Sequence, residues 1–391
     1  MAKLLEQKLD EFSDCLVEWY WIEKPWYLAA IIRRGDELEY KCITHELTSA
    51  EKSLEARVYN RLVDRLCFLD HDPTEAFARE ARKLLRYYFP RLNSLREAVI
   101  LHHLWTRCFG YERMDPLMKD PYIEDISCNG PGIPLYVYHM GHGFLRTNIS
   151  FTEEEIDDYV ARLAELAGKF LSAGSPVAEG ALPDGSRLTA FWRNDVSDRG
   201  SGFSIRRFRE EPLTPIDLIR LGTLSPELVA YLWVCVEYGL NALILGGTAS
   251  GKTSTLNALC LLIPSHRRIV TIEDTREIRL PHENWVPLVA REERVVDGSS
   301  EHIDLMFLLK KALRMRPEYL IVGEVRGVEA NVLFQAMNVG HIVYSTMHAA
   351  DLDEAIARLT NPPISVPMSM LIPLDLVLVQ AVTKVGGREA R

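Results

Sequence analysis

The sequence predicts an α/β protein in which a nucleotide-binding domain follows two smaller N-terminal regions. Three observations support this fold class. The chain has 391 residues, which is too long for one ordinary compact core. From about residue 225 onward, apolar strand-like segments alternate with helical segments, as in a sheet with helices on its faces. One of these strands runs directly into a glycine-rich loop and a helix.

The composition is that of a globular protein, with 47 % hydrophobic and 26 % charged residues. The formal net charge of −10 argues against nucleic acid as the main ligand. The seven cysteines are scattered and form no C-x-x-C pair, which indicates a reduced cytosolic protein without a zinc site or disulfide scaffold. The most apolar stretch, 228–247, is interrupted by Glu237, Gly239 and Asn241. It therefore predicts a helix and a buried strand, and membrane association is expected to come through a partner.

Residues 1–110 are expected to form a mostly helical N-terminal region. Apolar segments at 24–32 and 38–43 predict two short strands around a turn. Helical patterns follow at 48–68, 73–88 and 92–108. A cluster of tryptophans and tyrosines at 19–27 is interpreted as core packing, with a binding platform as the alternative.

Residues 111–208 are expected to form a smaller α+β domain. A hairpin is predicted at 135–149, and a helix begins after Thr152, where Glu155 completes a capping box. Two strands are predicted at 187–192 and 202–208. The charged segment 209–215, which contains Pro212 and Pro215, is interpreted as the linker to the nucleotide domain, 216–391.

Within 216–391, helices and strands alternate. Helices are predicted at 225–238, 252–262, 302–314, 328–338 and 352–359, and strands at 242–245, 268–272, 319–323 and 342–346. Ligands of such folds bind beyond the carboxyl ends of the strands.

The glycine-rich loop matches G-x-x-x-x-G-K-T in the strand–loop–helix context of a phosphate-binding P-loop. Its glycines let successive backbone N–H groups face phosphate oxygens, and the positive end of the helix dipole lies at the same place. Lys252 is expected to reach the β- and γ-phosphates of ATP, and the Thr253 hydroxyl to bind Mg²⁺. The predicted nucleotide-binding residues are Gly246, Gly247, Thr248, Ala249, Ser250, Gly251, Lys252, Thr253 and Ser254.

Carboxylates follow two further apolar strands. The strand at 319–323 ends in Gly323-Glu324, so Glu324 is expected to polarise the attacking water, with a simple ion pair to Arg326 as the alternative. Arg326 is also expected among the catalytic residues. The strand at 268–272 ends in Glu273 and Asp274, which are expected within reach of Mg²⁺ or the water.

Two histidines bracket the strand at 342–346. His348, at its carboxyl end, is expected to face the γ-phosphate and distinguish ATP from ADP. His341, which precedes the strand, is expected to belong to the catalytic site with it. A lone histidine at such a place would more often be structural, but the pair follows the Glu324 strand.

Taken in order, these four motifs resemble those of the ATPases of type II and type IV secretion, type IV pili and archaella, in particular the archaeal branch. The resemblance covers about 116–379. It implies a RecA-like domain, a homo-hexamer with ATP and Mg²⁺ between the two lobes of each subunit, and a polytopic membrane platform protein as client. It also implies arginines of the N-terminal lobe near the γ-phosphate, for which the candidates are Arg187, Arg193 and Arg207.

The leading hypothesis is an ATP hydrolase that drives assembly of a pilus, an archaellum or a secretion apparatus, with pilin, archaellin or secretion components as further partners. It would lie in the cytoplasm, peripheral to the membrane. The alternatives are a retraction or conjugation ATPase of the same superfamily and a nucleotide-gated scaffold with negligible hydrolysis. The chain departs from many bacterial relatives because it lacks a tetracysteine zinc motif. Relatives also usually continue beyond its last residues, so it is expected to be either C-terminally truncated or a short member.

Overall fold

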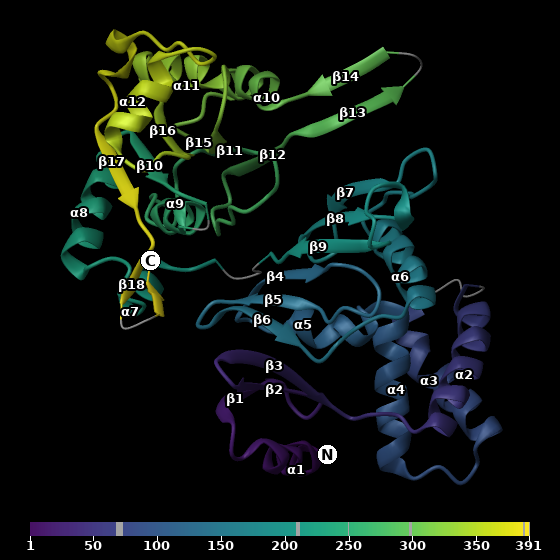
Figure 1. Ribbon diagram of the computed structural model, residues 1–391. Coiled ribbons are helices and arrows are strands. Elements are labelled where there is room, and N and C mark those ends of the chain that lie inside the picture. Colours follow the sequence, from purple (N-terminus) through teal and green to yellow (C-terminus); the bar gives the residue numbers. More distant parts are fainter. Residues whose placement is uncertain (68–72, 209–211, 249, 297–298, 386–387, 391) are drawn as a thin grey trace. The chain divides into compact units, whose positions relative to one another are not determined.

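The computed structural model describes residues 1–67, 73–208, 212–248, 250–296, 299–385 and 388–390. The chain divides into two compact units, Met1–Phe208 and Arg209–Arg391 (Figure 1). Among the described residues, no helix combines the length and apolarity needed to cross a bilayer.

A nine-stranded sheet forms the centre of the first unit, in the order β1-β2-β3-β6-β5-β4-β9-β8-β7. Neighbouring strands are antiparallel except β3 and β6, where Glu39 pairs with Arg146 in parallel register. The expected boundary at residue 110 is crossed by this sheet, because the strands before it and after it form one layer. The strands are β1 (Leu16–Glu23), β2 (Tyr27–Arg34), β3 (Glu37–Thr44), β4 (Ile123–Cys128), β5 (Tyr136–His139), β6 (Gly143–Thr147), β7 (Val177–Ala181), β8 (Arg187–Phe191) and β9 (Gly202–Arg206).

Helix α6 (Glu153–Leu166) begins as the sequence predicts. Thr152 accepts the N–H of Glu155, and the Glu155 carboxylate accepts the N–H of Thr152, so the capping box is complete. The apolar face of α6 packs on the sheet through Ile156, Tyr159 and Leu163. The shorter helical elements of this unit are α1 (Ala2–Gln7), η1 (Lys8–Phe12), η2 (Glu112–Met114), α5 (Asp115–Lys119) and η3 (Arg193–Asp195).

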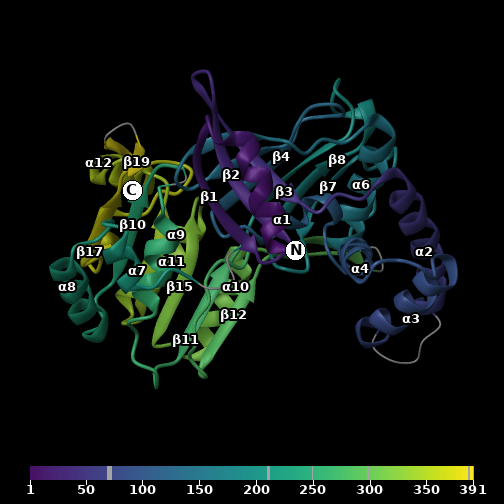
Figure 2. The same ribbon diagram turned by 90° about the horizontal axis from the view of Figure 1, so that it is seen from below.

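Three helices that follow β3 and precede β4 in the sequence form a bundle with its own apolar core. They are α2 (Ser49–Cys67), α3 (Pro73–Tyr88) and α4 (Ser94–Phe109). Val58, Leu62, Phe77, Leu85 and Leu104 are buried where they meet. In Figures 1 and 2, α4 lies closer to the strands, and α2 and α3 lie beyond it.

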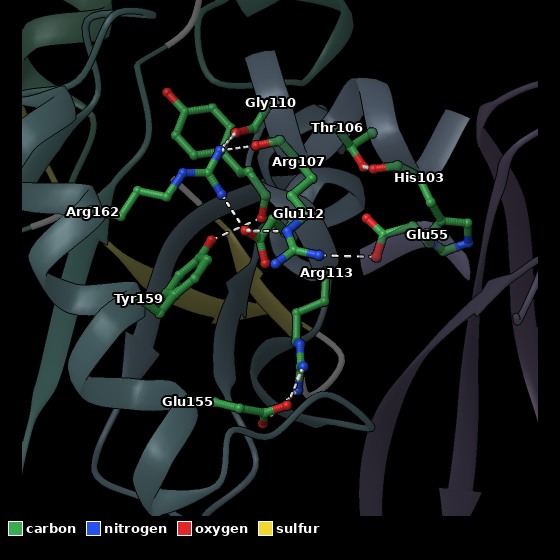
Figure 3. Close-up of polar contacts among 11 residues, drawn as sticks. Glu55, His103, Thr106, Arg107, Gly110, Glu112, Arg113, Glu155, Tyr159 and Arg162 are labelled. Carbon is green, nitrogen blue, oxygen red and sulfur yellow. Dashed lines mark hydrogen bonds and ion pairs between the residues drawn. The ribbon is translucent and has the colours of Figure 1, made fainter. Parts of the chain in front are cut away.

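Ion pairs join this bundle to α6 (Figure 3). The Arg162 guanidinium of α6 donates to the carbonyls of Arg107 and Gly110 at 2.7 and 2.9 Å, and it pairs with Glu112 at 2.5 Å. Arg107, in turn, pairs with Glu55 of α2 at 2.9 Å. Glu112 has a φ of 51°, a conformation that a non-glycine residue adopts at a cost, so its ion pair helps to hold a strained turn.

We expect Arg162→Ala to lower the free energy of unfolding by about 2–4 kcal/mol, because two carbonyls and a carboxylate would lose a charged donor. Urea unfolding followed by circular dichroism measures this. Arg206→Ala is the matched control, since Arg206 is 58 % exposed and makes one ion pair of 3.5 Å; it should cost no more than about 1 kcal/mol. Equal losses in the two variants would contradict the special role of Arg162.

The second unit contains a six-stranded sheet in the order β12-β11-β15-β16-β10-β17, and every strand pair in it is parallel. Alternate residues of β10 point to opposite faces, so Leu243 and Leu245 join one apolar core while Ala242 and Ile244 join the other. Helices cover both faces. The strands are β10 (Ala242–Gly246), β11 (Ile269–Glu273), β12 (Trp285–Val289), β15 (Tyr319–Val325), β16 (Ile342–Met347) and β17 (Leu376–Gln380).

The described helices of this unit comprise five that begin and end close to the predicted positions and others, such as the short helix at 215–220, that were not predicted. They are α7 (Pro215–Arg220), α8 (Pro226–Glu237), α9 (Lys252–Cys260), α10 (Leu305–Ala312), η4 (Leu313–Met315), α11 (Glu329–Asn338), α12 (Leu352–Thr360) and η5 (Met368–Leu371). Two small hairpins are added, β13 (Arg291–Val296) with β14 (Ser299–Ile303) and β18 (Thr383–Val385) with β19 (Arg388–Ala390).

The expected linker 209–215 needs one adjustment. Its first three residues lie outside the described residues, and its end is already helical. Thr214 caps α7 by accepting the N–H of Asp217, and Pro215 is the first helical residue, a position where proline's missing N–H is not needed.

Candidate functional site

Four parallel strands bring the predicted site segments to one edge of the second sheet. Strand β16 lies between β10 and β15, and β11 lies beyond β15. In register, Leu245 is level with Met347, and Ile272 is level with Val322. The carboxyl ends of these strands therefore carry the glycine-rich loop, His348, Glu324 and Glu273 at the same edge.

The glycine-rich loop connects β10 to α9, as the sequence predicts. A side chain at Gly246 would lie 2.4 Å from the Ser250 hydroxyl oxygen and 2.5 Å from the Gln380 carbonyl oxygen, so only glycine fits there. Gly251 has a φ of +94° and directly precedes the first turn of α9. The Gly247 carbonyl accepts hydrogen bonds from Lys252 Nζ at 2.6 Å and from Ser250 Oγ at 3.0 Å. Lys252 is thus held over the loop; Ala249 lies outside the described residues.

Glu273 is a buried carboxyl at the end of β11, only 3 % exposed. Its Oε1 accepts the N–H groups of Glu277 and Ile278 at 2.8 and 2.9 Å, whereas its buried Oε2 has no hydrogen-bond partner among the described residues. Burial raises the pKa of this carboxyl to about 7. It packs on Gly323, where an added Cβ would lie 3.2 Å from Glu273 Cγ. Gly323, the residue before Glu324, therefore leaves room for the Glu273 side chain. Its neighbour Asp274 is exposed.

The raised pKa of Glu273 predicts a pH dependence of stability. The unfolded chain loses this proton near the ordinary glutamate pKa of 4.5, but the folded chain keeps it to about pH 7. The folded state therefore binds more protons between these values, and this carboxyl destabilises the protein progressively as pH rises from about 4.5 to 7. In Glu273→Gln that contribution disappears. The unfolding free energy of the wild type, relative to the variant, should fall by about 3 kcal/mol between pH 4.5 and 8.

Urea unfolding of both proteins across this pH range measures the difference. Asp274→Asn is the matched control, because that neighbouring carboxyl is exposed. Parallel pH curves for the wild type and Glu273→Gln would contradict a buried, proton-holding Glu273.

Glu324 lies near the end of β15 and pairs with Arg326. Their carboxylate oxygen and guanidinium nitrogen are 2.5 Å apart. The hydrogen bond to Glu324 raises the pKa of the Arg326 guanidinium. The side chain of Glu324 is 25 % exposed and that of Arg326 is 66 % exposed, so the pair is open to solvent and can separate at modest cost. The ion pair expected as the alternative is therefore present, at the edge where a water-activating carboxylate is needed.

The two histidines lie at opposite ends of β16. His348 follows the strand, and its Nε2 lies 3.0 Å from the Thr248 hydroxyl of the glycine-rich loop. His341 precedes the strand, and its Nδ1 contacts the Pro317 carbonyl at 3.0 Å. The structure therefore brings His348 to the glycine-rich loop and does not bring His341 there.

The three candidate arginines belong to the first unit and have different surroundings. Arg187 on β8 pairs with Glu179 at 3.7 Å, and Arg193 pairs with Asp157 at 3.3 Å; both are at least half exposed. Arg207 instead donates to the backbone carbonyls of Asp120 and Ile123. Its guanidinium thus fixes a loop of its own unit.

Gln380 is a site residue that the sequence pattern did not indicate. It ends β17, which pairs with β10, and its side-chain oxygen accepts the Thr255 hydroxyl at 3.2 Å. Its carbonyl closes the back of the loop at Gly246. The short apolar run 376–379 was the local signal for this strand.

The residues present fit a nucleoside triphosphate with Mg²⁺. The glycine cradle, the N-terminus of the nine-residue α9 and Lys252 offer donors for phosphate. Thr253 directly follows Lys252, and the unpartnered Oε2 of Glu273 lies at the same sheet edge. Hard oxygen donors of this kind suit Mg²⁺, which keeps several waters and needs few protein ligands.

Comparison with known proteins identifies the family. The model of the family described as Type II/IV secretion system protein matches residues 142–386. An uncharacterized protein of Methanocaldococcus jannaschii is 39 % identical over 368 residues, which cover 91 % of this chain and 66 % of that protein. A second uncharacterized protein of that organism is 41 % identical over 230 residues. The matched region covers 57 % of this chain and 32 % of that protein.

Two further relatives carry more specific descriptions. The conjugal transfer protein TrbB of Rhizobium radiobacter is 30 % identical, over 62 % of this chain and 72 % of that protein. The crystal structure of the Legionella pneumophila ATPase DotB aligns with a TM-score of 0.50 and 20 % identity, covering 68 % of this chain and 75 % of that one. At this identity the likeness concerns the fold, and it confirms the expected RecA-like domain preceded by a smaller α+β part. The chain belongs to the type II/IV secretion system protein family.

Proposed function

We propose that this protein is an ATP hydrolase that works as a homo-hexamer and drives assembly of a type IV pilus, an archaellum or a related secretion apparatus. The observation that carries the proposal is the convergence of the glycine-rich loop, Glu324, Glu273 and His348 at one sheet edge. These groups supply hydrogen-bond donors for the phosphates, an acceptor for the proton of water and a histidine that can sense the γ-phosphate. Phosphoryl transfer needs such groups in one place.

Each residue has a defined task in this proposal. Lys252 and the first amides of α9 bind the phosphates, and Thr253 and Glu273 help to hold Mg²⁺, which neutralises charge on the phosphate oxygens. Glu324 orients a water and accepts its proton; its release from Arg326 exposes the carboxylate for that role. His348 is placed to couple the state of the loop to β16 through Thr248.

The exposed arginines of the first unit are proposed to complete the site. Arg187 and Arg193 each make one ion pair that solvent already screens, so exchange of the carboxylate for a phosphate is inexpensive. Arg207 is committed to backbone carbonyls, so its loss should affect folding first. Arg187→Ala should therefore slow phosphate release while ADP affinity stays nearly unchanged.

Phosphate release by the purified protein, with and without a platform-protein fragment, tests the function, and light scattering with an ATP analogue tests the hexamer. Binding of ATP without any phosphate release, under all these conditions, would favour a nucleotide-gated scaffold instead. The likeness to a conjugal transfer protein keeps a conjugation ATPase as the second candidate. The identity of the platform partner that stimulates hydrolysis separates the two systems.

A further inference from the structure

The solvent face of α3 carries a continuous row of cations. Basic residues recur every three or four positions, so they lie on one side of the helix. The side chains of Arg79, Arg82 and Lys83 are 55–66 % exposed. The opposite side of α3 is buried in the bundle through Phe77, Ala81, Leu84 and Leu85. We call this row, with the turn that follows it, the α3 basic face; its members are Arg79, Arg82, Lys83, Arg86 and Arg91.

Carboxylates neutralise only part of the α3 basic face, where Arg82 pairs with Glu97 at 3.7 Å. Glu80 is shared by Arg65, Arg79 and Lys83 at 3.2, 3.4 and 2.8 Å, so one negative charge serves three cations. Arg86 and Arg91 have no ion pair within the part of the chain that the structure describes. Residues 49–109 contain eleven basic and eight acidic side chains, a net charge of +3, although the whole chain carries −10. The remainder therefore carries −13, and the bundle is a positive region on an acidic protein.

Aromatic side chains lie at the end of this row. Tyr87 is 79 % exposed and Phe89 is 50 % exposed. They gather at the carboxyl end of α3, between Arg86 and Arg91, and are not spaced along the whole row, whereas single-stranded nucleic acid is usually held by bases stacked along a basic groove. A broad anionic surface that also accepts aromatic rings at its boundary matches this arrangement better. The headgroup region of a bilayer has both properties.

We propose that the α3 basic face binds directly to a bilayer surface that carries anionic headgroups. Each arginine or lysine near such a surface contributes attraction that falls off within the screening length of the salt. Tyr87 and Phe89 would enter the interface where the helix ends. The remainder of the chain carries net negative charge, so the attraction to such a surface is expected from the bundle. This contact would add to any attachment through a membrane partner, and it does not depend on ATP hydrolysis.

Vesicle co-sedimentation of the full-length chain, without nucleotide, tests the proposal. The vesicles contain phosphatidylcholine alone or with about one third phosphatidylglycerol, the anionic lipid that supplies the surface potential. The wild type should bind only the anionic vesicles, and binding should disappear near 1 M salt, where the screening length is about 3 Å. The double variant Arg86→Glu/Arg91→Glu should bind at least about 100-fold more weakly, since each reversal changes the charge by two and each unit of charge counts for roughly fivefold.

A matched control reverses the same number of charges elsewhere on the first unit. Arg33 and Lys169 are exposed and lie outside the bundle, so Arg33→Glu/Lys169→Glu should keep binding within about threefold of the wild type. Tyr87→Ser/Phe89→Ser retains every cation and should weaken binding while leaving its salt dependence. Thermal melting must be alike for all variants, as expected for exposed positions.

Several results would overturn the lipid contact. The first is that the wild type does not bind anionic vesicles, and the second is that both charge-reversal pairs lose vesicle binding equally. The third is that the protein retards single-stranded DNA in a gel, in a way that depends on Arg86 and Arg91, and does not bind vesicles. Phosphate release is measured separately and without vesicles, so failure of the proposed hydrolysis is not confused with failure of the lipid contact.

Discussion

Lys252→Ala should abolish phosphate release and weaken ATP binding at least about 100-fold, because a charged donor to the phosphates is lost. In the structure Lys252 Nζ is held by the Gly247 carbonyl at 2.6 Å, next to the start of α9. The same carbonyl keeps the Ser250 hydroxyl at 3.0 Å, so the loop retains a contact that shapes it without the lysine. The variant should therefore fold normally and fail in binding.

Isothermal titration with ATP and a phosphate assay measure both effects. Lys310→Ala serves as the control, since Lys310 is an exposed lysine on α10 of the same unit. Wild-type ATP affinity together with wild-type turnover in Lys252→Ala would remove the basis for assigning the loop to phosphate.

Glu324→Gln should bind ATP and Mg²⁺ but release phosphate at least about 100-fold more slowly, the lower range of general-base contributions. The amide keeps the shape of the carboxylate at the end of β15 but cannot accept the proton of water. It also loses the charge that pairs with Arg326. The two roles must therefore be separated.

Arg326→Ala separates them, because it removes the ion pair and leaves the carboxylate. If Glu324 activates water, this variant should lose much less turnover than Glu324→Gln. Equal losses would mean that the ion pair itself matters, and retained turnover in Glu324→Gln would move the proton acceptor to Glu273 or elsewhere. Single-turnover phosphate release with both variants decides between these outcomes.

Local patterns were sufficient for much of the nucleotide domain. The glycine-rich loop, the Glu324 strand and the Glu273 strand are each short apolar runs that end in polar residues, and parallel pairing then places those ends together. The capping box at Thr152 was equally local, since its two hydrogen bonds join residues three positions apart.

Elements that depend on distant partners were not predictable in this way. Strand β1 (Leu16–Glu23) has no clear alternation of buried and exposed residues, so its tryptophans and tyrosines indicated only a core. The parallel pairing of β3 with β6, which joins the first region to the second, involves residues more than 100 positions apart. The separation of the two histidines, in contrast, follows from the sequence alone. Seven residues of extended chain span roughly 20 Å, so His341 and His348 were never able to share one site.

The pairing of β10 with β17 also affects how the nucleotide site is made during synthesis. The strand that supplies the glycine-rich loop is complete by Gly246, but the carbonyl that closes its back belongs to Gln380, and the Asn241 N–H donates to the Asp375 carboxylate. A nascent chain emerging from the ribosome must therefore extend about 130 residues beyond the loop before that wall exists. Until then, the apolar edge of β10 on that side is unpaired and is a target for chaperones or for the same edge of another nascent chain.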